Sequence, residues 1–335
     1  MPSPDLEMQK ILERLRREPA VDYRSMPIGK ARDLFEEAAR PWNEDAPAVE
    51  TRNLTIASPQ HAMRARLYLP SGGARLHGGE RFTLILYAHG GGWTFGSIDT
   101  HDGTMRRLAL ASGCAVLGMD YRLAPEHPFS APLDDLMTAI AFAESGALGE
   151  SIDSSRLALA GDSAGANLAL AALLRRRDAG KARLLGSRLQ DSRLQDSRLL
   201  GAALFYGCYL PDFATQSHAS HGNGDYLLST EGMRWYWDNF LGGEGVDTKS
   251  LAAPYHSGLA GLPPLYLSAA GLDPLRDDTV MLAEKLVKAE VDFRFDHVPG
   301  VVHGHLRMAG ELSAARRSIE AAGEFLADLT KCGSS

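Results

Sequence analysis

The sequence predicts an α/β fold in which a mostly parallel central sheet carries helices on both faces. Short apolar runs of the kind that form buried strands recur along the chain, and stretches with helical spacing separate them. Several of these runs lead directly into glycine-rich or acidic turns. The runs are 82–88, 157–160, 199–205, 264–270 and 293–298, and two earlier ones, 51–57 and 64–69, are expected to form an antiparallel start.

The segment 161–165, Gly-Asp-Ser-Ala-Gly, has the form of a nucleophile elbow. It follows the apolar run 157–160 and precedes a helix-like stretch, 167–177. A serine on so tight a strand-to-helix turn needs small residues two positions before and after it, and the two glycines supply them. The turn would lift the Ser163 hydroxyl out of the sheet toward a substrate.

Three consecutive glycines, Gly90 to Gly92, follow the apolar run 82–88. Glycines expose backbone amides, and amide donors about 3 Å from the former carbonyl oxygen stabilise the negative charge that develops in acyl transfer. In an α/β-hydrolase such a segment follows the third strand, and the remaining amide comes from the residue after the nucleophile, here Ala164. The order of the two motifs therefore predicts an α/β-hydrolase.

A serine nucleophile needs a base to take its proton and an acid to orient that base. Asp273 lies at the end of the apolar run 264–270, and His303 lies in a glycine-flanked loop after the run 293–298. The chain order of serine, acid and histidine is that of the α/β-hydrolases. We therefore expect Ser163, Asp273 and His303 to form a catalytic triad.

Other acids and histidines lie close to these two. Asp277 and Asp278 fall in the first turn of the following helix, where carboxylates interact favourably with the helix dipole, so we expect structural roles for both. His297 lies within a strand-like run and is expected to pack or to cap an edge. His297 and His305 are the two serious alternatives to His303 as the base.

Together these motifs resemble the bacterial hormone-sensitive-lipase family of carboxylesterases, a branch of the α/β-hydrolases. The resemblance covers about residues 51–330. Five motifs in one order carry it: 89–93 (HGGGW), 120–129 (DYRLAPEHPF), 161–165 (GDSAG), 273–277 (DPLRD) and 303–304 (HG).

The resemblance implies hydrolysis of carboxylic esters through an acyl-enzyme on Ser163, with Asp273 and His303 as its partners. It also implies short- to medium-chain acyl groups, because lids of this type enclose a modest pocket. The amides implied as oxyanion donors are those of Gly91, Gly92 and Ala164, with Gly90 as an uncertain further member.

The same resemblance divides the chain into a core and a helical lid. Residues 1–50 contain two helix-like stretches that form part of the lid, and residues 209–250 form a lid insertion rich in aromatic side chains. Residues 51–208 and 251–335 form the two parts of the hydrolase core. Most aromatic residues of the insertion are expected to pack in the lid. The residues expected to line the substrate pocket are Trp93, His305 and Trp235.

Two features depart from the family's pattern. The family usually has phenylalanine where this chain has His305, which either tunes substrate choice or the pH profile, or is a surface variant. Residues 187–199 contain a tandem five-residue repeat whose period matches neither a helical face nor strand alternation. We interpret the repeat as a local duplication that forms an exposed excursion or a helix extension without a catalytic role.

Composition and motif content exclude several other classes of function. The formal net charge of −7 and the lack of a basic stripe argue against a nucleic-acid partner and favour a small, uncharged or weakly polar ester. No four residues have the spacing of a structural zinc site, and the glycine segment lacks the lysine of a phosphate-binding loop. We therefore expect no metal and no cofactor.

The cysteines and the hydropathy pattern predict a cytoplasmic protein. Cys114, Cys208 and Cys332 are odd in number and far apart, so we expect reduced thiols and not a disulfide framework. The amino terminus lacks the apolar core of a signal peptide, and no stretch approaches the length that crosses a bilayer, so we expect no membrane partner.

Other functions are compatible with the same motifs. A lactonase, an amidase or an acyltransferase would keep this triad and differ in what the lid admits. A non-catalytic ligand-binding receptor on the same fold would be expected to lack part of the triad, whereas all three members are present here. The resemblance also makes a homodimer through an exposed edge strand an expectation.

Overall fold

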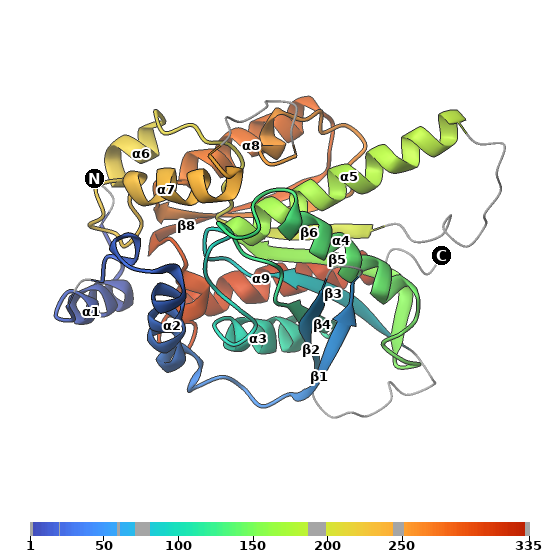
Figure 1. Cartoon of the computed structure of the whole chain (residues 1–335), viewed down its shortest axis with the longest axis horizontal. Helices are drawn as coiled ribbons and strands as arrows, with labels where there is room; N and C mark the ends of the chain where they lie inside the picture. Colours follow the sequence, from blue (N-terminus) through green and yellow to red (C-terminus); the bar gives the residue numbers. More distant parts are fainter. Residues whose placement is uncertain are drawn as a thin grey trace.

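The computed structural model describes residues 3–19, 21–58, 61–70, 81–186, 199–243 and 251–331. Within these ranges an eight-stranded sheet forms the centre of the molecule, in the order β1-β2-β4-β3-β5-β6-β7-β8 (Figure 1). Strand β2 is antiparallel to both β1 and β4, and the other neighbours are parallel. The strands are β1 (Glu50–Ala57), β2 (Ala62–Leu69), β3 (Phe82–Ala88), β4 (Ala115–Met119), β5 (Ile152–Asp162), β6 (Leu199–Phe205), β7 (Leu265–Leu272) and β8 (Phe293–Val302).

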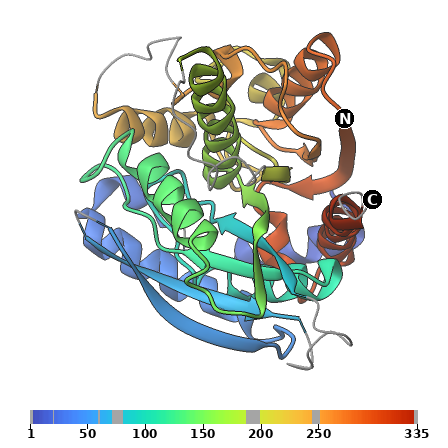
Figure 2. The ribbon, with the colours of Figure 1, turned by 90° about the vertical axis from the view of Figure 1, so that its right-hand side faces the viewer.

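Helices cover both faces of the sheet (Figure 2). Helices α3 and α9 pack on one face, and α4, α5 and α8 pack on the other. Because both faces are covered, the central strands are buried on both sides, and every residue of β4 and β7 is buried. The helices are α1 (Leu6–Leu15), α2 (Ile28–Ala39), α3 (Asp102–Ser112), α4 (Ala131–Glu144), α5 (Ala164–Gly186), α6 (Gln216–His221), α7 (Thr230–Leu241), α8 (Arg276–Lys288) and α9 (Ser313–Lys331).

The predicted fold class is confirmed, and β3 and β6 have the predicted bounds. Strand β8 runs further than predicted, through Pro299 and Gly300 to Val302. Proline is tolerated there because β8 is an edge strand, so its missing N–H removes no ladder hydrogen bond. Gly300 has a φ of +73°, and the β7–β8 register shifts between Ala270 and Leu272. The Pro-Gly pair is therefore an irregularity within the strand, and β8 ends directly before His303.

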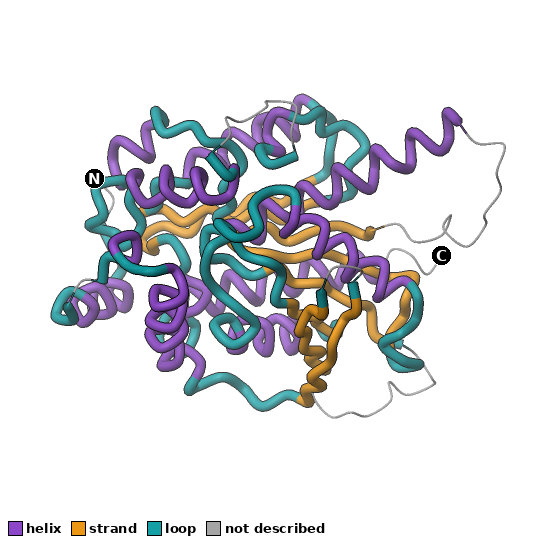
Figure 3. Tube along the Cα trace, in the orientation of Figure 1, coloured by secondary structure: helices purple, strands orange, loops and turns teal. Residues whose placement is uncertain are grey.

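Helices from two distant parts of the chain lie beyond the same end of the sheet, at the left of Figure 1. Helix α2 comes from the amino-terminal part, and α6 and α7 come from the predicted insertion (Figures 1 and 3). Trp237 and Phe240 of α7 are buried against Trp93, whose ring stacks on Phe240 with centroids 4.0 Å apart. The dense aromatic residues of the insertion thus pack in part as a core beneath α7.

Several remaining features bear on the sequence-based expectations. Cys114 and Cys208 are buried free thiols, as predicted, and Cys332 lies outside the described residues. The repeat lies outside them too, except for Leu199, the first residue of β6. None of the described helices combines the length and the apolar character needed to cross a bilayer.

A close backbone contact joins the start of α5 to the end of β3. A Cβ atom on Gly165 would overlap the carbonyl oxygen of Ala88, and one on Gly161 would lie 2.5 Å from the Gly165 carbonyl. Only glycine fits at both positions, because the elbow and the neighbouring strand leave no room for a side chain. This contact sets how closely the elbow approaches the glycine segment that follows β3.

Replacing Gly165 by alanine is expected to destabilise the protein. Overpacking of a tight buried site costs about 1–3 kcal/mol, which corresponds to a fall of several degrees in Tm. Gly180→Ala is the matched control, since Gly180 lies in the same helix with no atom near its Cβ position. Thermal unfolding of both variants checks this, and equal Tm values would contradict the close contact.

Candidate active site

Ser163 occupies the turn between β5 and α5. Its φ is +53°, in the left-handed region that residues other than glycine rarely adopt. Its N–H donates to the carbonyl of Phe205 at 2.8 Å, which anchors the turn to the end of β6. The sequence therefore forms the sharp, strained strand-to-helix turn that an exposed nucleophile requires.

The structure brings together the three residues predicted to form the triad. His303 Nε2 lies 2.9 Å from Ser163 Oγ, and His303 Nδ1 lies 2.7 Å from Asp273 Oδ2. Asp273 follows β7 and is fully buried, and its Oδ1 accepts the N–H of Leu275 at 2.8 Å. With the imidazole proton on Nδ1, Nε2 is free to accept the serine proton.

The two alternative histidines do not reach Ser163. His297 is exposed on β8. His305 is fully buried in the short helix η5 (His305–Met308), where its ring nitrogens lie 3.2 Å from the Val302 carbonyl and 3.4 Å from Ser318 Oγ. The interpretation of His305 as a surface variant is therefore wrong. Burial lowers the pKa of His305 to about 4, so the ring is neutral near neutral pH.

The glycine segment presents two amides to the site. Gly91 and Gly92 have φ values of +121° and +59° and line the same cavity as Ser163 and His303. Within the described residues, neither of these two amides donates a hydrogen bond. Ala164 is the first residue of α5, where helical N–H groups lack intrahelical partners.

The Gly90 amide, unlike those of Gly91 and Gly92, already donates a hydrogen bond within the protein. Its N–H donates to Asp162 Oδ1 at 2.9 Å, so this amide is not available to an oxyanion. Asp162 also accepts the Tyr87 hydroxyl at 2.8 Å and lies 3.4 Å from His101 Nε2. Burial alone would raise the pKa of Asp162, but His101 and the Tyr87 hydroxyl lower it well below its usual range. The buried carboxylate therefore stays ionised and ties the glycine segment to the elbow.

Glu126, the second carboxylate of the 120–129 motif, contacts helix α2. Glu126 forms a two-pronged ion pair with Arg32 of α2, at 2.6 and 2.8 Å. The same guanidinium donates to the carbonyls of Thr94 and Ala124, each at 2.9 Å. Arg32 thus attaches α2 both to the loop that follows the glycine segment and to the 120–129 segment.

The cavity above Ser163 has a volume of about 150 Å³. Its walls come from α2, from the insertion and from η5. They include Phe35, Leu227, Leu228, Met233, Tyr236, Arg307 and Met308.

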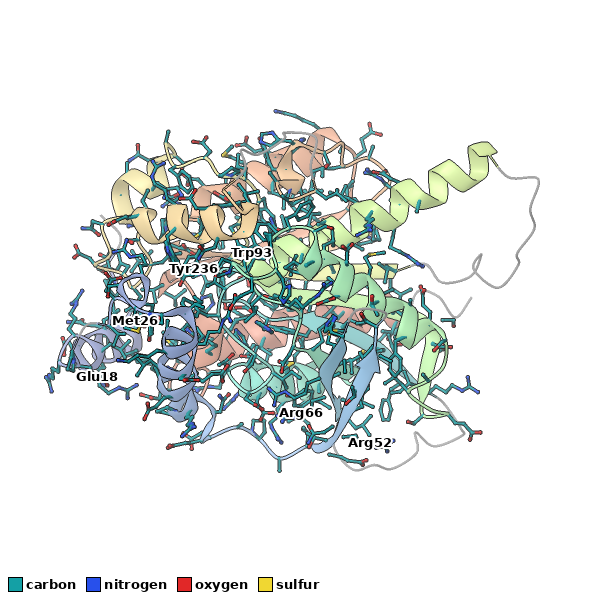
Figure 4. The ribbon with its side chains drawn as sticks, in the orientation of Figure 1. Glu18, Met26, Arg52, Arg66, Trp93 and Tyr236 are labelled. Atoms are coloured by element: carbon teal, nitrogen blue, oxygen red, sulfur yellow. The ribbon has the colours of Figure 1, made fainter. Side chains whose placement is uncertain are left out.

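None of the three residues predicted to line the pocket belongs to the walls of this cavity. Trp93 is fully buried beneath α7, and His305 is buried behind the catalytic loop. Trp235 borders an adjoining hollow beside Tyr23, which shares Leu227, Leu228 and Tyr236 with the cavity. Tyr236, labelled with Trp93 in Figure 4, is the aromatic residue of the insertion that lines the cavity. Its ring occupies the space where a side chain on Gly92 would lie.

The chain resembles known esterases in both sequence and structure. Residues 85–307 match a family described as the alpha/beta hydrolase fold. Carboxylesterase NlhH of Mycobacterium tuberculosis is 32% identical over 75% of this chain and 74% of its own length. Esterase LipI of the same organism is 33% identical over 80% of this chain and 79% of its own. The chain belongs to the hormone-sensitive-lipase family of α/β-hydrolases.

A solved structure agrees with this membership. The ester hydrolase EH1AB1 from the metagenome of Lake Arreo, solved with a bipyridine phosphonate derivative, superposes with a TM-score of 0.86 at 30% identity. The match covers 99% of this chain and 100% of that one. As a member of this family, the protein is a carboxylic ester hydrolase.

The buried His305 predicts a specific loss of stability in acid. Its folded-state pKa of about 4 lies below the ordinary value of 6.5, so between these values the unfolded chain binds a proton that the native protein does not. Stability should therefore fall as the pH falls through this window. From about pH 7 to about pH 5, wild type should lose about 2 kcal/mol more than His305→Phe.

Urea unfolding of both proteins at the two pH values measures this difference. His127→Phe is the control, because His127 is exposed. If wild type and His305→Phe lose the same stability on acidification, His305 is not held neutral in the fold.

Proposed function

We propose that this enzyme hydrolyses short- to medium-chain carboxylic esters through an acyl-enzyme on Ser163. The observation that carries the proposal is the continuous chain of contacts from Ser163 Oγ to His303 at 2.9 Å and from His303 to Asp273 at 2.7 Å. Both contacts lie within the range in which a base can take a proton and an acid can orient that base.

The reaction proceeds in two halves. Ser163 Oγ attacks the ester carbonyl while His303 Nε2 takes the hydroxyl proton, and Asp273 stabilises the imidazolium through Nδ1–H. His303 then donates that proton to the departing alcohol. A water molecule attacks the acyl-enzyme with His303 again as base, which releases the acid and restores the Ser163 hydroxyl.

The amides of Gly91, Gly92 and Ala164 serve as donors to the oxyanion. The positive φ of Gly91 and Gly92 and their place on the cavity wall support this role. The Gly90 amide takes no part, because Asp162 holds it. Losing one such donor typically lowers kcat by about a hundred- to a thousandfold.

The size and borders of the cavity support short acyl groups and a two-part lid. A cavity of about 150 Å³ is small beside ordinary ligand sites, which span about 300–1,000 Å³. Phe35 from the amino-terminal part and Tyr236 from the insertion both border it. We assign residues 1–50 and 209–250 to the lid, and residues 51–208 and 251–335 to the hydrolase core.

A homodimer and a cytoplasmic location stay predictions. The outer edge of β8 pairs with no strand among the described residues, and Phe295 on it is an exposed aromatic side chain. These features support a dimer that forms through this edge.

Hydrolysis of p-nitrophenyl esters from acetate to laurate tests the proposal. We expect activity to fall as the acyl chain lengthens, because the cavity is small, and Ser163→Ala to lose at least about a thousandfold in kcat. Ser145→Ala is the control, since Ser145 is an exposed serine at the end of α4.

Activity that survives in Ser163→Ala would contradict the assigned nucleophile. Inactivity of wild type toward the whole series would contradict the esterase proposal, and lactone and amide panels would then separate the remaining hydrolases from a receptor.

A further inference from the structure

One charged side chain on the cavity wall has no part in the proposed reaction. Arg307 lies in η5, close after His303, and is half-buried. It lines the same cavity as Ser163. Among the described residues, its guanidinium forms no hydrogen bond and no ion pair, and its contact is with the ring of Phe35, 5.2 Å from the centroid.

Several other half-buried arginines of the described chain are paired with carboxylates, and Arg107 and Arg316 donate to backbone carbonyls instead. Arg32 pairs with Glu126, Arg66 with Asp102, and Arg122 with Asp135. Pairing is the rule because removing a charge from water without a partner is costly. Arg307 has neither kind of partner; Arg156 also has none among the described residues, but Arg307 lines the cavity.

The two carboxylates nearest the site form no direct ion pair with Arg307. Asp162 is held by the Gly90 amide, the Tyr87 hydroxyl and His101, and Asp273 is held by His303. The Arg307 charge still reaches the cavity, since it helps to lower the pKa of Asp162. The guanidinium thus lines the substrate cavity with no direct anionic partner among the described residues.

We propose that Arg307 is a specificity-determining residue that binds a carboxylate carried by the ester substrate. The inference rests on the proposed function and names the substrate class of the same site: an ester with a second, ionised carboxyl group on its acyl or its alcohol part. The planar guanidinium suits this partner, because it presents parallel N–H donors to both carboxylate oxygens.

The rest of the cavity fits the spacer of such a molecule. Phe35, Leu228, Met233 and Met308 are apolar wall residues between which a short aliphatic chain can lie. This substrate class differs from the uncharged ester that the acidic composition of the whole chain favours. The net charge of the whole chain affects the long-range attraction of a substrate to the protein. Arg307 instead interacts with the ester once it is bound in the cavity.

A purely structural role makes a different prediction. Through its ring contact, Arg307 also joins η5 to α2, and loss of that contact alone would change the turnover of charged and neutral esters by the same factor. The ratio between a charged ester and its neutral isostere therefore separates substrate binding from lid packing.

The experiment compares kcat/KM for matched ester pairs at constant ionic strength. Monomethyl glutarate and its ω-amide test an acyl-side carboxylate, and O-acetylglycolate and O-acetylglycolamide test an alcohol-side one. Wild type should prefer the anionic member of at least one pair by about tenfold to a hundredfold, the usual contribution of a hydrogen bond to a charged group. Arg307→Gln should bring that ratio close to one, and Arg307→Lys should retain part of it.

Arg52→Gln is the matched control, because Arg52 lies on β1 at the far edge of the sheet (Figure 4), and it should leave the ratio unchanged. The absence of any anionic preference in wild type would overturn the proposal without need of a variant. So would an equal loss for both members of a pair in Arg307→Gln. Failure of wild type to hydrolyse the neutral p-nitrophenyl esters would instead contradict the proposed function.

Discussion

The close approach of two adjacent parallel strands is the constraint on which the site depends. Ala88, the last residue of β3, pairs with Gly161 near the end of β5, and the elbow touches the β3 backbone at Gly165. One strand leads into the glycine segment and the other into Ser163. Asp162 then fixes the two relative to each other through the Gly90 amide. Nucleophile and amide donors are therefore held by the sheet and need little rearrangement during the reaction.

Residues whose type is dictated by local sterics or chemistry could be predicted from the sequence. Gly161 and Gly165 mark the elbow because no other residue fits, and the apolar runs mark strands because both faces of the sheet are covered. The triad could be predicted because each of its members directly follows a strand, β5, β7 or β8, so the chain order and the strand ends determined the choice of Asp273 and His303.

The pocket walls could not be predicted in the same way, because they form between segments that are distant in the chain. Phe35 and Arg307 carry no local signal, and each gains its place only when α2 and η5 meet above Ser163. Trp93 was a wrong choice for a wall residue, because it is fully buried and its ring stacks on Phe240 of α7. The run 293–298 was expected to lead into a loop, yet β8 continues through Pro299 because an edge strand tolerates proline.

The central claim is that Ser163 is the nucleophile of a pre-formed triad. Reaction of the protein with a phosphonate ester, followed by mass spectrometry of its peptides, tests this claim most directly. The structure predicts one phosphonyl group per chain, on Ser163, with esterase activity lost in step with its formation and no adduct in Ser163→Ala. Loss of activity with the adduct on another residue, or full activity after Ser163 is modified, would contradict it.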